Sequence, residues 1–314
     1  MIPQKLIENG TEQKCLVKKK TKQAVSIILP AKNEATSLTE LLPLLQQRQP
    51  TAEIIVVDDG SSDDTYAVCQ SFGVTVLQHP YSLGNGAAIK TGTRYAKGDI
   101  LVFMDADGQH NPDDIPRLLE KMADNYEMVV GARQTGTHAS MHRWLANSFY
   151  NRLASFMTGH RIEDLTSGFR ATRARHFRKF LYLLPNGFSY PTTSTMAFFR
   201  SGFPVAYIPI QAKKREGKSH IKILMDGIRF FIIILKIGAL FSPMRLFLPI
   251  STGLFFLGMI YFGYTHFSTG RFTNMSALLF ISSLFTFLIG IISEQISSLY
   301  YKGADESQRR VQRK

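Results

Sequence analysis

The chain has 314 residues, and its 37 Lys and Arg residues outnumber its 24 Asp and Glu residues, which gives a formal net charge of +13. An apolar content of 45% is that of a globular chain and excludes intrinsic disorder and a collagen-like architecture. The two cysteines, Cys15 and Cys69, are too few for a disulfide framework and lack the spacing of a zinc or iron–sulfur ligand set.

The first 24 residues are polar and basic and include three consecutive lysines at 18–20. They lack the apolar core of a signal peptide, so we interpret residues 1–24 as a mobile basic arm. A charge run of this kind is more often a solvated tail than a binding surface, and no nucleic-acid partner is expected.

Residues 25–218 alternate short β-branched apolar runs with helix-like stretches, which is typical of an α/β domain around a mostly parallel sheet. Strands are expected at 25–30, 53–59, 74–78, 99–105, 128–132 and 205–210. Helices are expected at 34–48, 63–72, 86–96, 113–124 and 143–157. Ligands of open α/β sheets bind beyond the carboxyl ends of the strands, so the polar residues after each strand are the candidate site.

The run IIVVDDGSSDDT at 54–65 places Asp58 and Asp59 directly after an apolar strand. Gly60 allows the chain to turn, and Ser62 or Asp63 can then cap the next helix. Helix capping explains the residues after the turn. It does not explain Asp58, which lies at the carboxyl edge of the sheet, where it can contact a ribose or a base.

A second acidic pair, Asp105 and Asp107, follows the apolar strand ILVFM. Two carboxylates at this spacing can place oxygen atoms around one Mg²⁺ or Mn²⁺ that is shared with a diphosphate, and Gln109 can add a neutral oxygen. A solvated loop pair is the alternative for such a triplet taken alone. The position after a core strand favours the metal site.

Residues 211–245 carry eight basic and two acidic residues. Within them, residues 221–241 are apolar except for four charges that fall on one face of a helix: Lys222, Asp226, Arg229 and Lys236. We expect an amphipathic helix in the lipid headgroup layer, within a juxtamembrane segment at 219–245. A third spanning helix is the competing interpretation, and it would have to carry four charges across the hydrocarbon core.

Two nearly uncharged segments follow, at 246–267 and 275–300. At about 1.5 Å per residue, each can cross a hydrocarbon core of about 30 Å, whereas a soluble core hairpin is the alternative. The link between them has one charge, Arg271, and both flanks are basic. The positive-inside rule therefore places the catalytic domain and both termini in the cytoplasm, with two transmembrane helices at 246–301 and a basic tail at 302–314.

The second apolar segment contains one acid, Glu294, near its expected cytoplasmic end. A carboxylate at that depth needs a partner, so we expect an interfacial or inter-subunit hydrogen bond, with a role in lipid handling as the alternative. Small residues of the first segment, Gly253, Gly258 and Gly263, are candidates for packing hairpins together in a homo-oligomer.

Five motifs occur in order along the chain: LPAKNEATSL, VVDDGSSDDT, GNGAAIKTG, DILVFMDADGQHNPDDI and DLTSGFR. In this order they resemble the inverting family 2 glycosyltransferases with a GT-A fold. The two apolar carboxyl-terminal segments make the chain similar to polyprenyl-phosphate glycosyltransferases, which include dolichyl-phosphate mannose synthases and undecaprenyl-phosphate glucosyltransferases. The resemblance covers about residues 25–301.

The resemblance implies a role for individual residues. A base pocket and a diphosphate site for the nucleotide sugar would be formed by Pro30, Lys32, Glu34, Asp58, Lys90, Asp105, Ala106, Asp107, Arg215 and Lys218. The metal ligands would be Asp105, Asp107 and Gln109. Arg143 and Asn147 would face the acceptor phosphate, and Arg133 would bind the donor or the acceptor phosphate. The catalytic residues would be Asp105, Asp107, Arg133 and Asp164. Arg suits phosphate because it forms two parallel charge-assisted hydrogen bonds. For Lys90, which follows the turn at Gly84 and Gly86, a structural role is the favoured alternative.

Asp164 of DLTSGFR is a candidate general base, because related transferases use an acid near this position to deprotonate a hydroxyl acceptor. A lipid phosphate is already ionised at neutral pH, so Asp164 can instead serve as a positioning residue. One departure from the family concerns the sugar pocket. Where many relatives have an acid after an aromatic stretch, this chain has only hydroxyl residues at 192–195.

The function that the resemblance implies is metal-dependent, inverting transfer of a hexose from a UDP- or GDP-linked sugar to a polyprenyl phosphate at the cytoplasmic membrane face. Two alternatives remain. One is a glycosyltransferase that acts on a hydroxyl acceptor such as diacylglycerol or a glycan. The other is a catalytically silent membrane scaffold, which the presence of Asp105, Asp107 and Arg133 disfavours.

Overall fold

A computed structural model describes residues 23–134, 141–187, 189–211 and 242–312, together with residues 231, 232, 235, 236, 238 and 239. The side chains of residues 141–147, 269 and 300–312 are outside this description. Most of the expected amphipathic segment at 221–241 also lies outside the described residues.

Seven strands form one sheet in the order β3-β2-β1-β4-β6-β5-β7. Their bounds are β1 (Val25–Ala31), β2 (Glu53–Asp58), β3 (Thr75–Gln78), β4 (Ile100–Phe103), β5 (Met128–Arg133), β6 (Arg170–Arg173) and β7 (Val205–Ile210). Every pairing is parallel except those of β6, which runs antiparallel to β4 and to β5. The expected α/β class with a mostly parallel sheet is confirmed, and β6 is an added strand that the sequence pattern did not predict.

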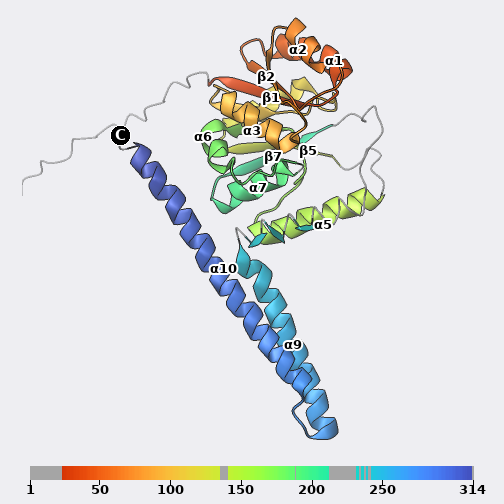
Figure 1. The fold of residues 1–314 in the computed structure, drawn as a ribbon, viewed down its shortest axis with the longest axis vertical. Helices are drawn as coiled ribbons and strands as arrows, with labels where there is room; N and C mark the ends of the chain where they lie inside the picture. Colours follow the sequence, from red (N-terminus) through yellow and green to blue (C-terminus); the bar gives the residue numbers. More distant parts are fainter. Residues whose placement is uncertain are drawn as a thin grey trace, which may run out of the picture.

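Helices cover both faces of this sheet (Figure 1). In chain order they are α1 (Ala35–Arg48), α2 (Thr65–Ser71), α3 (Asn85–Tyr95), α4 (Ile115–Met122), α5 (Met141–Thr158), α6 (Ala174–Phe177) and α7 (Tyr190–Arg200), with short 3-10 turns at Pro112–Asp114 and Arg178–Phe180. The expected helices are present, and α6 and α7 are further helices that the sequence pattern did not predict.

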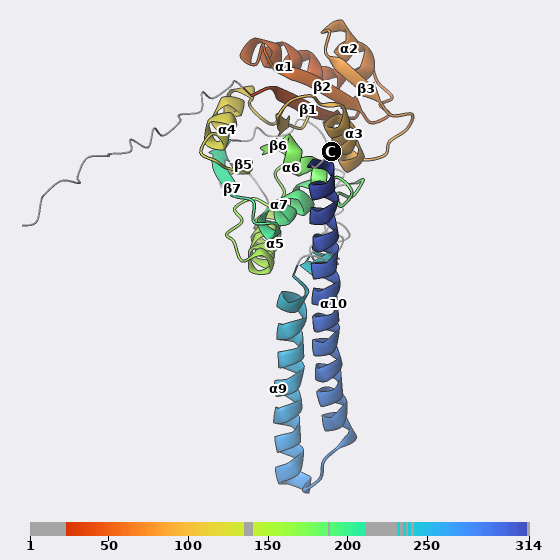
Figure 2. The same cartoon turned by 90° about the vertical axis from the view of Figure 1, so that its left-hand side faces the viewer.

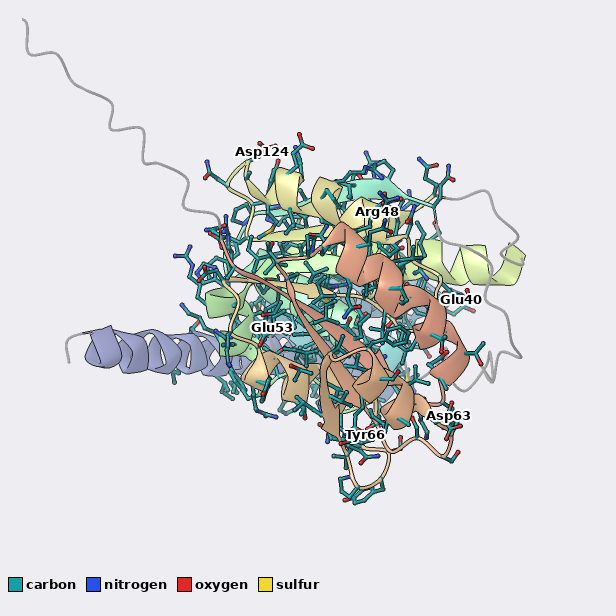
Figure 3. The ribbon with its side chains drawn as sticks, turned by 90° about the horizontal axis from the view of Figure 1, so that it is seen from above. Glu40, Arg48, Glu53, Asp63, Tyr66 and Asp124 are labelled. Atoms are coloured by element: carbon teal, nitrogen blue, oxygen red, sulfur yellow. The ribbon has the colours of Figure 1, made fainter. Side chains whose placement is uncertain are left out.

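The two layers follow from the alternation of side chains along each strand. Ile27 and Leu29 of β1 pack with α1, α2 and α4 on one face, whereas Ile28 between them packs with α3, α5, α6 and α7 on the other. Both apolar clusters are buried, so the strands are held from both sides and their carboxyl ends are fixed in space. Figure 3 shows α1 and the surrounding loops from above, at the end of the domain that is remote from the carboxyl-terminal hairpin.

Two long antiparallel helices, α9 (Pro243–Thr269) and α10 (Asn274–Gln312), extend away from the α/β domain as a hairpin (Figures 1 and 2). By length and composition, Pro243–Ser268 and Asn274–Leu299 can each cross a membrane, with mean hydropathies of 1.8 and 2.3. Most of their apolar side chains are exposed, which is the opposite of the core helices of a soluble domain. Both expected spans fall inside these helices, and α10 continues to Gln312.

Polar contacts join the two helices of the hairpin. Ser251 and Ser283 each donate a hydrogen bond from Oγ to the other's carbonyl oxygen, at 2.9 Å in both directions. Glu294 accepts a 3.3 Å hydrogen bond from the backbone N–H of Met244, in the first turn of α9. The Glu294 carboxylate therefore satisfies one of the unpaired N–H groups at a helix start within its own chain.

The glycines of α9 divide into two groups. Gly258 faces α10, where an added Cβ would lie 3.2 Å from the Phe280 ring and 3.3 Å from Leu279. Gly253 and Gly263 have no described atom within 4 Å of an added Cβ. Gly258 therefore serves packing within the hairpin, and association between copies through the other two remains a prediction.

Candidate active site

Hydrogen bonds join the loop after β1 to the loop after β2. The backbone N–H of Asn33 donates to Ser61 Oγ at 2.9 Å, and Asn33 Oδ1 accepts from the backbone N–H of Ser62 at 2.8 Å. Asn33 adopts a left-handed conformation with φ of 56°, which asparagine tolerates better than most residues. The motifs KNE and DDGSSDDT thus form one rigid edge of the sheet.

Asp63 completes this junction. One of its oxygens accepts from the backbone N–H and the hydroxyl of Thr65 at the start of α2, at 3.1 Å and 2.5 Å. The other accepts from the backbone N–H of Ala35 at the start of α1, at 3.2 Å. The Asp63 carboxylate therefore accepts from the first N–H group of both helices, whereas the N-cap residue of α2 is Asp64, whose side chain makes no capping hydrogen bond.

Asp58 lies buried at the end of β2. Its two oxygens accept hydrogen bonds from the backbone N–H of Ser61 at 2.9 Å and from Gln78 Nε2 at 3.1 Å. Next to it is a cavity of about 350 Å³ lined by Gly60, Ser61, Gln78, His79 and Pro80. Of the residues expected in a base pocket, buried Pro30 lies on the neighbouring strand, exposed Lys32 follows that strand and half-buried Glu34 precedes α1.

Asp59, which is also buried, holds the loop between β3 and α3. It accepts hydrogen bonds from the backbone N–H groups of Leu83 and Gly84, both at 2.8 Å, and from Ser82 Oγ at 2.7 Å. His79 Nδ1 lies 2.7 Å from its Oδ1. Burial opposes ionisation of Asp59, but these hydrogen bonds outweigh it and hold the pKa of the carboxyl below its usual value.

We expect Asp59→Asn to lower the free energy of unfolding by about 2 to 4 kcal/mol near neutral pH, because an amide oxygen replaces a charged acceptor of several buried donors. The wild-type pKa is depressed, so this stabilisation is complete above the unfolded pKa of about 4 and is lost as the pH falls through the folded pKa. Thermal melts of both proteins from pH 3 to 7 measure it, with exposed Asp64→Asn as the control. A difference in stability between the wild type and Asp59→Asn that stays constant down to pH 3 would contradict this role.

Asp105 lies two residues after β4, at the centre of the same sheet edge. Burial opposes its ionisation, but the nearby His110 ring, the charge of Arg133 and the nearby Asn85 side chain hold the pKa of Asp105 below its usual range. His110 Nε2 lies 3.7 Å from Asp105 Oδ2. The backbone of Gly168 closes the other side, because a Cβ there would lie 2.8 Å from the same oxygen. Asp105 is thus an oriented carboxylate anion.

Asp107 and Gln109 follow on the same loop and are half-buried, and Ala106 between the two acids is buried in the core. The backbone N–H of Gln109 donates to Asp107 Oδ1 at 3.2 Å. No group of three or more His, Cys, Asp or Glu side chains with metal-site geometry occurs among the described residues. Two carboxylates and an amide oxygen nevertheless fit a hard cation that takes its remaining ligands from a substrate diphosphate.

Arg133 at the end of β5 forms a two-pronged ion pair with Asp164. Its Nε lies 2.8 Å from Asp164 Oδ2, and its Nη2 lies 3.0 Å from Oδ1. Asp164 also accepts from the backbone N–H groups of Thr166 and Ser167, both at 3.1 Å. Burial raises the pKa of Asp164, but the bonds and charge of Arg133 outweigh it and hold this pKa below its usual value. A carboxylate with these partners is a weak base, which favours a positioning role.

Lys90 and the turn before it contact a different part of the chain. Lys90 Nζ donates to the Leu184 carbonyl at 3.1 Å and also to Asn186 Oδ1. A Cβ on Gly86 would lie 2.0 Å from the carbonyl oxygen of Pro185, so this position requires glycine. These contacts support the structural alternative for Lys90, and its contact with phosphate stays a prediction.

The structure brings Asp105, Asp107, Gln109, Arg133 and Asp164 to neighbouring strand ends. Other predicted site residues are not described: Arg215 and Lys218 lie outside the described residues, as do the side chains of Arg143 and Asn147 on α5. Their roles stay predictions.

Sequence reasoning missed three residues of this site: Asn85, His110 and Arg170. A signal for His110 was available, because it directly follows Gln109 in the motif DADGQH. It is buried and stacks on Phe169 with ring centroids 5.0 Å apart. Asn85 and Arg170 also lie inside the motifs GNGAAIKTG and DLTSGFR, but only the fold places them at the same sheet edge as Asp105.

The chain combines a mostly parallel sheet, with carboxylates at its carboxyl edge, and a hairpin of two helices that are long and apolar enough to cross a membrane. The chain belongs to glycosyl transferase family 2, which matches residues 26–181, and residues 242–299 match the GtrB C-terminal hairpin. The expected family is confirmed, and the chain is a glycosyltransferase.

Curated relatives act on polyprenyl phosphates by name. The undecaprenyl-phosphate mannosyltransferase of Micrococcus luteus is 33% identical over 210 residues, which cover 61% of this chain and 84% of the relative. The polyprenol monophosphomannose synthase of Mycolicibacterium smegmatis is 29% identical, with 62% and 79% covered. An undecaprenyl-phosphate 4-deoxy-4-formamido-L-arabinose transferase of Pseudomonas fluorescens is 27% identical, with 88% and 85% covered.

Solved structures share the fold of the α/β domain. Glucosyl-3-phosphoglycerate synthase from Mycobacterium tuberculosis, in complex with Mn²⁺, UDP and phosphoglyceric acid, has a TM-score of 0.58 and 19% identity. The match covers 69% of this chain and 79% of that one. At this identity the likeness shows the GT-A fold alone.

Proposed function

We propose that this protein transfers a hexose from a nucleotide sugar to a polyprenyl phosphate at the cytoplasmic face of a membrane, with inversion at the anomeric carbon. The observation that carries the proposal is the placement of Asp105 and Asp107, just after β4, and of Arg133, at the end of β5, on the two strands that flank β6 at one sheet edge. Two anionic reactants can meet only where a cation and fixed guanidinium groups offset their charges. The names of the curated relatives support the same acceptor class.

In the donor half of the site, Asp105, Asp107 and Gln109 would hold a Mg²⁺ or Mn²⁺ ion. When bound, the ion supplies positive charge to the departing nucleoside diphosphate. Asp58 and the cavity beside it are suited to the base or ribose, because one wall is polar and fixed by the loop contacts of Ser61 and Gln78. Lys32, Glu34, Arg215 and Lys218 complete the proposed donor site.

In the acceptor half, the Arg133 guanidinium would bind the lipid phosphate, and Asp164 would hold that guanidinium in position. The side chain of Arg133 is 40% exposed, whereas that of Asp164 is 10% exposed. A ligand in solvent can therefore contact the arginine, and the more buried acid holds the guanidinium in position. The phosphate oxygen attacks the anomeric carbon as the diphosphate leaves from the opposite side. A single displacement of this kind converts an α-linked donor into a β-linked lipid phosphate sugar.

Contacts between α5 and the start of α9 support the proposed membrane arrangement. On α5, which runs across the base of the domain (Figure 1), Phe149 and Phe156 are 54% and 55% exposed. Arg245 Nη1 donates to the Phe156 carbonyl at 3.1 Å, which ties the end of α5 to the start of α9. Exposed aromatic side chains on α5, next to the start of the hairpin, are suited to the lipid interface. The catalytic domain at 25–218, the segment at 219–245 and both termini would then lie on the cytoplasmic side.

Transfer assays test the proposed function. Purified protein is incubated with radiolabelled UDP- or GDP-linked hexoses and undecaprenyl phosphate, with and without EDTA. We expect label in an acid-labile lipid phosphate sugar with one class of donor, and loss of this product with EDTA that excess Mg²⁺ or Mn²⁺ reverses. Transfer to diacylglycerol or a glycan instead would favour the hydroxyl-acceptor alternative. Absence of transfer with every donor and acceptor would overturn the proposal.

A further inference from the structure

Arg170 is a fully buried side chain at the edge of the candidate site, with 0% exposure. It is the first residue of β6, where it pairs with Phe103 of β4 and Val130 of β5. These two strands lead to Asp105 and Arg133, respectively. Because β6 runs antiparallel to both, its first residue lies at the edge of the sheet where their carboxyl ends meet.

The Arg170 guanidinium is hydrogen-bonded to neutral acceptors. Nε donates to the Ser167 carbonyl at 3.2 Å, and Nη2 donates to the same oxygen. Nη1 donates to the Pro191 carbonyl at 3.0 Å and to the hydroxyls of Ser194 and Thr195, both at 2.9 Å. Among the described residues, no carboxylate lies within ion-pair distance of this group. The hydroxyl-rich segment at 192–195 thus supplies neutral partners for a buried cation.

A buried charge without a counter-ion is unfavourable, and arginine cannot relieve it by losing its proton near neutral pH. A carboxylate at either hydroxyl position would neutralise the charge directly. The chain instead places two neutral side chains there, and the acids that interact with the guanidinium through space are Asp164 and Asp105. Because Arg170 pairs with Phe103, two residues before Asp105, this positive charge lies at the same sheet edge as the carboxylates of the site.

The same contacts fix the backbone beneath Asp105. Ser167, whose carbonyl binds Arg170, precedes Gly168, and an added Cβ on Gly168 would lie 2.8 Å from Asp105 Oδ2. The phenolic hydroxyl of Tyr190 donates to the Gly168 carbonyl at 3.1 Å. Arg170 and the start of α7 thus hold the segment that orients the Asp105 carboxylate.

We propose that Arg170 is a positioning residue for the nucleotide-sugar donor: it holds the Ser167–Gly168 backbone against Asp105, and its unneutralised charge favours binding of the anionic diphosphate. Ser194 and Thr195 satisfy its hydrogen bonds without cancelling that charge. This inference rests on the proposed function, because it concerns the donor that the site would bind.

The test compares Ser194→Asp with Ser194→Asn. The two replacements have nearly the same shape and can each accept a hydrogen bond from Arg170, so charge is the main difference between them. We expect Ser194→Asp to bind UDP or GDP, each with Mn²⁺, about five- to tenfold more weakly than Ser194→Asn, and to raise the donor KM by the same factor. Its melting temperature should equal or exceed that of the asparagine variant, because a buried ion pair replaces a neutral contact. Calorimetry and thermal melts measure both quantities.

A purely structural role for Arg170 predicts equal nucleotide affinities in the two variants, and that result would overturn the inference. The pair Thr195→Asp and Thr195→Asn makes the same comparison if the Ser194 variants do not fold. As a second readout, Arg170→Lys should retain more donor affinity than Arg170→Met, because only lysine keeps the charge. Wild-type protein that binds neither UDP nor GDP with Mn²⁺ would count against the proposed function, whereas normal wild-type binding with equal affinities in the variants overturns this inference alone.

Discussion

Replacement of Asp107 by alanine should lower the rate of sugar transfer by at least about a thousandfold and leave the fold intact. The proposed cation loses one of its two carboxylate ligands, and metal stabilisation of a leaving diphosphate is worth several kcal/mol, where each 1.4 kcal/mol is about tenfold in rate. Asp107 is half-buried in the loop after β4 and belongs to neither apolar cluster. The melting temperature should therefore change little.

Transfer of labelled hexose to undecaprenyl phosphate measures the rate, and a thermal melt in detergent reports the fold. Asp124→Ala is the matched control, because Asp124 is an exposed acid whose described partner is the surface residue Lys121. Its transfer rate should remain within about twofold of the wild type, as is usual for surface sites. An Asp107→Ala protein that keeps more than a tenth of the wild-type rate would place the metal elsewhere.

Replacement of Arg133 by alanine should lower kcat/KM for the lipid phosphate by about a hundred- to a thousandfold, the usual cost of removing one fixed donor to a reacting anion. Arg133→Lys should recover part of this loss, because lysine keeps the charge but not the planar pair of N–H donors. The donor KM should change less than the acceptor KM. A selective rise in the donor KM would instead assign Arg133 to the nucleotide diphosphate.

Asp164→Asn separates the two roles left open for that acid. Since Asp164 holds Arg133 through two hydrogen bonds, the variant should lose rate by about tenfold or more with no change in the shape of the pH–rate profile. A general base would show the opposite: the wild-type rate would fall below a pKa that disappears in the variant. Glu163→Gln, at the adjacent partly exposed acid, is the control.

Much of the α/β domain follows from local pattern. The runs that form β1, β2 and β5 are short, apolar and β-branched, and each ends at a polar residue or a turn. The positions of Asp58 and Asp105 at the sheet edge follow from those strand ends. The two apolar helices were equally predictable, because the length of an uncharged segment is a property of the chain alone.

Two of the three unpredicted elements, β6 and α7, show why local pattern was not sufficient. The strand β6 reads RATR, which has neither an apolar run nor a clear alternation, and it forms because β4 and β5 offer hydrogen-bonding edges on both sides. The helix α7 reads YPTTSTMAFFR, and its run of hydroxyl residues has low intrinsic helix propensity. Burial against the core and the hydrogen bonds to Arg170 outweigh that propensity.

The amino-acid sequence by itself determined the family, the acidic pairs and the apolar hairpin, because each is a local pattern of residues that are close together in the chain. Only the tertiary structure decided the partners: that Arg133 binds Asp164, that Lys90 binds the segment before α7, and that Arg170 is surrounded by neutral acceptors. Partners of this kind come from residues far apart in the chain. Their contacts depend on which strands lie side by side, and in this sheet the order of the strands differs from their order in the sequence.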